Sequence, residues 1–148
     1  MPVKMSNEEY KAYAEQHAPR SQASRNMLRA FVVGGAICCF GQLLMNIYLA
    51  LGAEKETAAP LVSVSLIFVG ALLTGFGVYD NIAKFAGAGS LVPITGFANS
   101  VVAPALEYKT EGLITGTAAK MFVISGPVIV YSVAASVVYG FAYWLLSL

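Results

Sequence analysis

Charge is scarce in this chain. Only 11% of its 148 residues are charged and 57% are hydrophobic, whereas about 25% of a typical soluble domain is charged. The single histidine, His17, leaves no cluster of histidines and carboxylates for a metal or for acid–base catalysis. A net charge of +1 offers no basic surface for nucleic acid. We therefore expect no enzyme, no cofactor or metal, and no nucleic-acid partner.

Cysteine is equally scarce. The two cysteines, Cys38 and Cys39, are adjacent and lie in an apolar run. This arrangement makes no disulfide framework. Because free cysteine behaves as a small apolar residue, we interpret the pair as two small residues of a helix.

Long apolar runs are what the chain does contain. A helix needs about 20 apolar residues to cross a hydrocarbon core of about 30 Å. We expect full spans over residues 30–52, 60–79 and 121–148. The sequence therefore predicts an all-α integral membrane protein with a single membrane domain, residues 30–148, in the lipid bilayer.

Residues 1–29 form a polar tail. Ser6 and Glu9 have the spacing of a capping box, which predicts a short helix that starts there, and Pro19 is expected to end it. One face of this helix would carry Tyr10, Tyr13, Ala14 and His17. Such an amphipathic helix either lies at the lipid headgroups or docks on a partner protein.

The charges around the first span indicate its orientation. Arg20, Arg25 and Arg29 precede it with no acidic residue among them. The positive-inside rule then places the N-terminus in the cytoplasm. The second span returns inward, and Pro60 is expected in its first helical turn.

Residues 85–106 carry no charge, yet they are a poor membrane helix. The residues that interrupt them are Gly87, Gly89, Pro93, Gly96 and Pro104. Irregular backbone at membrane depth is tolerated only where protein or a wet cavity shelters it. We expect two short helical pieces joined by unwound backbone near residues 91–95, with Thr95 capping the second piece. The favoured topology is a broken or re-entrant segment beside three full spans, and the alternative is a fourth, kinked span.

Polar residues inside the apolar runs mark a candidate solute path. Gln42 and Asn46 share one face of the first span, where they are costly toward lipid. That face must meet either a neighbouring helix or an aqueous path. The candidate path or constriction comprises Gln42, Asn46, Gly87, Gly89, Pro93, Thr95, Gly96 and Asn99.

Charged residues beside the broken segment form a candidate mouth. Asp80 and Lys84 have the spacing of a helical ion pair. Lys120 either extends to the membrane surface or faces a cavity. The whole candidate mouth comprises Asp80, Lys84, Glu107 and Lys120. In the last span, Ser132, Ser136 and Gly140 form a stripe of small residues for close helix packing.

Two segments carry a family resemblance. FVVGGAICCFGQ (31–42) and FAGAGSLVPITGFANS (85–100) resemble signature segments of the SpoVAC/SpoVAEB family of spore membrane proteins. The resemblance covers the chain from about residue 20. It implies a place in the inner membrane of the forespore and dormant spore. It also implies a role in moving dipicolinic acid, as its calcium chelate, into the forespore and out at germination.

The resemblance also implies partners, namely the AEB membrane subunit and the soluble AD subunit of the SpoVA complex. Two hypotheses follow, a pore-forming subunit and a non-conducting scaffold. For a pore, the N-terminus of a half-helix near Gly96 and Asn99 is the best candidate for binding carboxylates. Lys84 and Lys120 would add positive charge there. Asp80 or Glu107 would meet calcium, which prefers oxygen ligands.

Overall fold

The structure, a computed structural model, describes residues 6–17 and 22–147, apart from the side chains of residues 12 and 15–17. Every regular element in these residues is helical. The elements are α1 Asn7–His17, α2 Ala23–Ala50, α3 Lys55–Gly75, α4 Val78–Ala86, α5 Ala88–Leu91, α6 Ile94–Glu107, the 3-10 turn η1 Lys109–Glu111, the π-helical turn η2 Leu113–Ala118, and α7 Ala119–Leu146. Within the described residues, three helical stretches are long and apolar enough to cross a membrane: α2, α3 and the continuous η2–α7. The predicted all-α fold with three spans is confirmed.

The second span begins and ends earlier than expected. α3 starts at Lys55, so Pro60 lies inside the helix and not in its first turn. That prediction was wrong because the charged residues before Pro60 belong to the helix. Glu56 in the first turn stabilises this start, since its negative charge lies at the positive end of the helix dipole. α3 ends at Gly75, and Tyr79 therefore belongs to α4.

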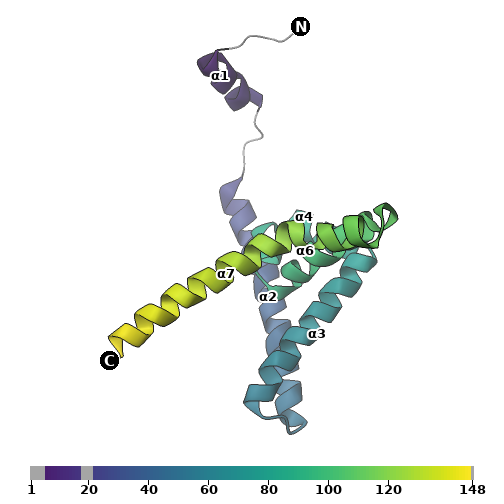
Figure 1. The fold of residues 1–148 in the computed structure, drawn as a ribbon, viewed down its shortest axis with the longest axis vertical. Helices are drawn as coiled ribbons and strands as arrows, with labels where there is room; N and C mark the ends of the chain where they lie inside the picture. Colours follow the sequence, from purple (N-terminus) through teal and green to yellow (C-terminus); the bar gives the residue numbers. More distant parts are fainter. Residues whose placement is uncertain (1–5, 18–21, 148) are drawn as a thin grey trace.

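α2 and α3 form an antiparallel hairpin (Figure 1). Near its closed end the hydroxyls of Tyr48 and Ser65 are hydrogen-bonded at 2.6 Å. Further along, Gly41 of α2 faces Leu66 and Val62 of α3, where a Cβ would make ordinary van der Waals contacts. The start of α2 and the end of α3 consequently lie at the same end of the molecule.

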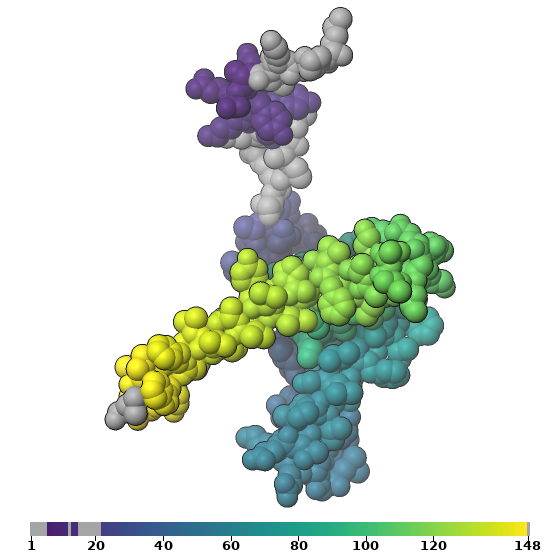
Figure 2. Space-filling view, viewed as in Figure 1, coloured from purple at the N-terminus to yellow at the C-terminus, as the bar shows by residue number. Residues whose placement is uncertain are grey.

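Most of the buried core sits at the broken segment, and the spans add only a few buried residues such as Ala58 and Ser125. Tyr79, Ala86, Ser90, Thr95 and Ala98 are each at most 6% exposed. By contrast, residues 127–147 of the last span are all exposed. Figure 2 shows this outer half of α7 projecting away from the α2–α3 hairpin. The spans must therefore be covered by lipid or by other chains.

The capping box before α1 is confirmed. The Ser6 amide donates to Glu9 Oε2 at 2.9 Å, and the Glu9 amide donates to Ser6 Oγ at 3.2 Å. Tyr10 and Tyr13 are exposed, as expected for a helix that meets a surface. Pro19, Arg20 and the side chain of His17 lie outside the described residues.

Candidate functional site

The broken segment consists of three helical pieces. α4 ends at Ala86, and Gly87, with φ +54°, makes the sharp turn into α5. α5 ends at Leu91, and α6 begins at Ile94 after extended backbone at Pro93. The prediction of two pieces missed the break at Gly87. Only glycine adopts this left-handed conformation readily, so the first break depends on that residue.

Tyr79 joins the three pieces. Its hydroxyl is hydrogen-bonded to the Ser90 carbonyl oxygen at 2.8 Å and to Thr95 Oγ1 at 3.0 Å. All three residues are buried. Thr95 therefore does not cap the second half-helix as predicted, because Pro93 occupies the position before α6 and the Thr95 hydroxyl points to Tyr79. Buried hydroxyls need such partners, and Tyr79 supplies one from α4.

Two of the candidate path glycines serve close backbone contacts. A Cβ on Gly89 would collide with the backbone of Ala30 in α2. A Cβ on Gly96 would collide with the carbonyl oxygens of Ser90 and Leu91. Both glycines are buried, so they hold α5 and α6 in place. The start of α6 near Gly96 accordingly faces protein carbonyls.

The broken segment enters and returns on the same side. Near the start of α6, Thr95 packs against Gly70 of α3. A Cβ on Gly70 would lie 3.1 Å from the Thr95 carbonyl oxygen. One turn later, Thr74 Oγ1 and Asn99 Oδ1 are hydrogen-bonded at 2.9 Å. α6 thus follows α3 toward the end where α4 began. Its 14 residues extend only about 21 Å, short of the roughly 30 Å of a bilayer core. The re-entrant form is confirmed over the four-span alternative.

A cavity of about 420 Å³ lies where α6 ends. Its lining comprises Thr74, Asp80, Asn99, Ala103, Leu106 and Glu107. The structure therefore brings together two predicted mouth carboxylates and one predicted path residue, Asn99. The predicted ion pair also forms, with Lys84 Nζ 2.6 Å from Asp80 Oδ2 on the exposed surface. No metal-holding group of three or more histidines, cysteines or carboxylates occurs in the described residues.

Lys120 lies apart from this cavity. Its Nζ sits 4.5 Å from the centre of the Tyr108 ring, and the residue is half-buried. A cation over an aromatic face is stabilised by the ring's charge distribution. Of the four predicted mouth residues, Asp80 and Glu107 line the cavity, Lys84 pairs with Asp80 from outside it, and Lys120 makes a separate contact beside η2.

Gln42 and Asn46 lie on an exposed face of α2. Gln42 Nε2 donates to Asn46 Oδ1 at 2.9 Å, and Cys38, one turn earlier, is also exposed. Mutual hydrogen bonding satisfies only part of two amide groups in a membrane-length helix. Since no described residue covers this face, another chain or water must meet its remaining polar groups.

Comparison with known proteins assigns the family. The family described as SpoVAC/SpoVAEB sporulation membrane protein matches residues 26–142, which include the hairpin except for the first three residues of α2, and the whole re-entrant segment. Stage V sporulation protein AC from Bacillus subtilis (strain 168) is 48% identical over 134 residues, covering 90% of this chain and 89% of the relative. The chain belongs to the SpoVAC/SpoVAEB family. No solved structure matches it.

The small-residue stripe of this SpoVAC/SpoVAEB protein has no helix against it within the described residues. Ser132, Ser136 and Gly140 are all exposed. The Ser132 hydroxyl donates to the Val128 carbonyl of its own helix at 2.7 Å. A Cβ on Gly140 would meet no atom within 4 Å. Close packing through this stripe stays a prediction, and the helix that packs on it would come from a second chain.

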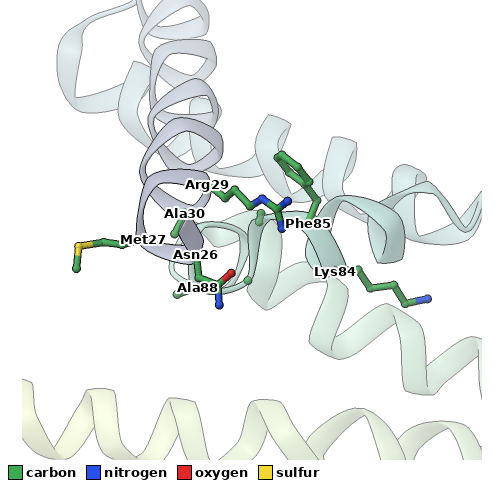
Figure 3. Close-up of a pocket in the computed structure, with 9 residues that line it drawn as sticks. Asn26, Met27, Arg29, Ala30, Lys84, Phe85 and Ala88 are labelled. Atoms are coloured by element: carbon green, nitrogen blue, oxygen red, sulfur yellow. The ribbon is translucent and has the colours of Figure 1, made fainter. Parts of the chain in front are cut away.

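Sequence reasoning missed two features of the site. One is Tyr79, which looked like the last residue of a span. The other is a cleft between the start of α2 and the α4–α5 turn, where Arg29 lies over the Phe85 ring (Figure 3). Spacing along the chain carries no signal for either, because both depend on how distant segments pack.

Proposed function

We propose that the chain is a membrane subunit of the SpoVA complex and forms part of a channel for dipicolinic acid, carried as its calcium chelate. The channel would cross the inner membrane of the forespore and spore, serving uptake in sporulation and release in germination. The subunit would move its solute without catalysing a reaction. Its N-terminus would face the cytoplasm, because Arg25 and Arg29 precede the apolar part of α2.

The observation that carries this proposal is the cavity at the mouth of the re-entrant segment. Asp80 and Glu107 supply carboxylates, and Asn99 supplies an amide group, at the point where α6 returns to the end of α3. Calcium prefers oxygen ligands of this kind and accepts variable coordination. A calcium chelate with open coordination positions could therefore pause here before passing further.

The exposed polar pair on α2 supports a multi-subunit channel. Gln42 and Asn46 lie on a face that the described part of the chain leaves exposed. A neighbouring subunit, with the AEB membrane subunit as the proposed partner, would complete the path there. The soluble AD subunit would dock at a membrane surface.

Flux through reconstituted complexes tests the proposal. The chain and its AEB partner are purified together, placed in liposomes loaded with calcium dipicolinate, and efflux is recorded. We expect Glu107→Gln to change efflux about ten-fold, the effect of about 1.4 kcal/mol on a rate, while the yield of complex stays the same. The control is Glu56→Gln, at the start of α3 and far from the cavity, which should leave efflux unchanged. Absence of efflux with the unmodified pair would contradict the proposal.

The alternative function is a scaffold that assembles the complex and conducts nothing. The exposure of α2 and of the outer half of α7 favours it, because both surfaces are free for other subunits. For a scaffold, changes at Gln42 and Asn46 would lower efflux only in proportion to lost complex. Efflux divided by the amount of complex separates the two functions.

A further inference from the structure

The cleft missed by sequence reasoning has a volume of about 420 Å³ and lies between α2 and the α4–α5 turn (Figure 3). Its polar and aromatic lining includes Asn26, Arg29, Lys84 and Phe85, with Met27 and Ala88 beside them. Sites of this size hold small molecules or lipid headgroups. The Arg29 end of α2 is the end that the positive-inside rule places at the cytoplasmic surface.

Two cations line this cleft, Lys84 and Arg29, and of these Arg29 is the one without a carboxylate partner among the described residues. Its guanidinium carbon lies 4.7 Å from the centre of the Phe85 ring, and the residue is half-buried. Within the described part of the chain, the ion pair that forms is Asp80–Lys84, and no carboxylate pairs with Arg29. Figure 3 shows Lys84 extending away from Arg29. A guanidinium stacked on a ring keeps its N–H edge available for an anion.

Apolar hollows adjoin the cleft along α2. One, of about 350 Å³, shares Ala30 and Ala88 with the cleft and continues past Phe31, Gly35, Cys38, Val92 and Pro93. Another shares Met27 with the cleft and Phe31 with the first hollow. The surface therefore changes from cationic at Arg29 to wholly apolar within a few turns of α2, along the crossing with α5.

We propose that the cleft and the adjoining hollow bind one anionic phospholipid. Its phosphate contacts Arg29, which offers paired N–H groups to phosphate oxygens. One acyl chain follows the apolar hollow between α2 and α5 past Gly35. Basic pockets between membrane helices at the cytoplasmic side are suited to anionic headgroups, and that leaflet carries negative lipids. A free phosphate would leave the apolar hollow without an occupant.

The bound lipid would touch a structural joint of the protein. The cleft and the adjoining hollow share Ala30 and Ala88 as lining residues. At the same place Gly89 packs on the backbone of Ala30. That contact holds α5 of the re-entrant segment against α2. A lipid that occupies the cleft and the hollow would contact both α2 and α5 and stabilise their packing. The stability of the re-entrant segment would then depend on lipid composition.

Native mass spectrometry of the purified full-length chain tests the site, with phosphatidylglycerol and phosphatidylcholine as probes in a neutral detergent. We expect the unmodified chain to prefer phosphatidylglycerol, and Arg29→Gln to weaken that binding about ten-fold. The matched control is Arg25→Gln, one turn earlier on α2, because Arg25 is exposed and does not line the cleft. Equal preference for both lipids, or equal loss with the two variants, would overturn the proposal.

A second variant tests the acyl-chain hollow without relying on charge. Gly35 lines the hollow and a Cβ there would meet no atom within 4 Å, so Gly35→Leu introduces its side chain at an open position of the hollow. We expect it to lower phosphatidylglycerol binding, whereas Gly140→Leu, on the exposed outer half of α7, should not. Unchanged binding in Gly35→Leu would place the lipid elsewhere. Displacement of the lipid by millimolar glycerol phosphate alone would show an anion site that needs no lipid chain, and would equally overturn the proposal.

Discussion

The re-entrant segment and the outer half of α7 are packed in opposite ways. The re-entrant segment, α4 to α6, holds most of the buried residues, including Tyr79, Ser90 and Thr95. Its glycines at positions 89 and 96 pack directly against the backbone of neighbouring segments. In the outer half of α7, residues 127–147 are all exposed, and a side chain at Gly140 would meet empty space. The chain's own contacts therefore specify the broken segment, whereas the long spans must be covered by lipid or by other chains.

This contrast follows from the membrane as a solvent. A regular helix satisfies its own backbone and needs no partner inside a bilayer. A broken segment exposes backbone groups and must be enclosed by protein. Glycine, serine and threonine concentrate in residues 87–96 because small and hydroxylated side chains allow close approach and supply the missing hydrogen bonds.

The largest expected effect comes from adding one methyl group to the broken segment. Gly96→Ala would push a Cβ into the carbonyl oxygens of Ser90 and Leu91. We expect a loss of about 3 kcal/mol of stability from this overpacking, measured by thermal unfolding in detergent. Gly140→Ala has open space around it and should change stability by less than about 0.5 kcal/mol. Equal effects of the two variants would remove the contrast between the regions.

A smaller effect is expected from removing one buried hydroxyl. Tyr79→Phe keeps the ring but leaves the Ser90 carbonyl and the Thr95 hydroxyl without their partner. A buried polar group without a hydrogen bond costs about 1–3 kcal/mol. Tyr131→Phe, at a residue that is 76% exposed, is the control and should be near neutral. Chemical unfolding followed by circular dichroism measures both, and a neutral Tyr79→Phe would show that the three pieces are held by packing alone.

Sequence patterns predicted the features that local chemistry controls. Three apolar runs predicted three spans, the spacing of Ser6 and Glu9 predicted the capping box, and that of Asp80 and Lys84 predicted the ion pair. Glycine and proline in residues 85–106 predicted that the segment is broken. Each of these depends on residues within one element, so periodicity and spacing are sufficient.

Three errors at the candidate site share one cause, which is contact between distant segments. Thr95 was expected to cap its own helix, but its hydroxyl meets Tyr79 of α4. Lys120 was grouped with the charged mouth, but it lies over Tyr108. The cleft at Arg29 was not foreseen, because Phe85 reaches Arg29 only through the fold. Such pairings are determined by tertiary packing and leave no regular pattern along the chain.

The exposed amide pair on α2 tests whether the outer faces serve other subunits. Gln42→Leu would remove its hydrogen bond to Asn46, and a bond of this kind in a membrane helix is worth about 0.6 kcal/mol. We expect the isolated chain to keep its stability to within that amount and the yield of complex with partner subunits to fall. The control is Leu43→Gln, which adds an amide at an exposed neighbouring position on α2 where Gln42→Leu removes one. Unchanged complex with Gln42→Leu would show that this face meets lipid or water instead.

The smallest expected effect concerns α1 and its dependence on pH. Hydrogen bonds from the Ser6 backbone and then from its side chain lower the pKa of Glu9 below its ordinary 4.5. A carboxylate whose pKa is lowered by folding stabilises the helix above pH 4.5, and this contribution is lost as the pH falls through the lowered value. Protection of the amides of residues 7–17 against hydrogen exchange should therefore decrease below pH 4.5, while α3 is unaffected. Glu9→Gln should abolish most of this pH dependence, because it removes the carboxyl group that titrates. Glu8→Gln should preserve it, because Glu8 takes no part in the capping box. A pH response that persists in Glu9→Gln would assign it to another group in α1.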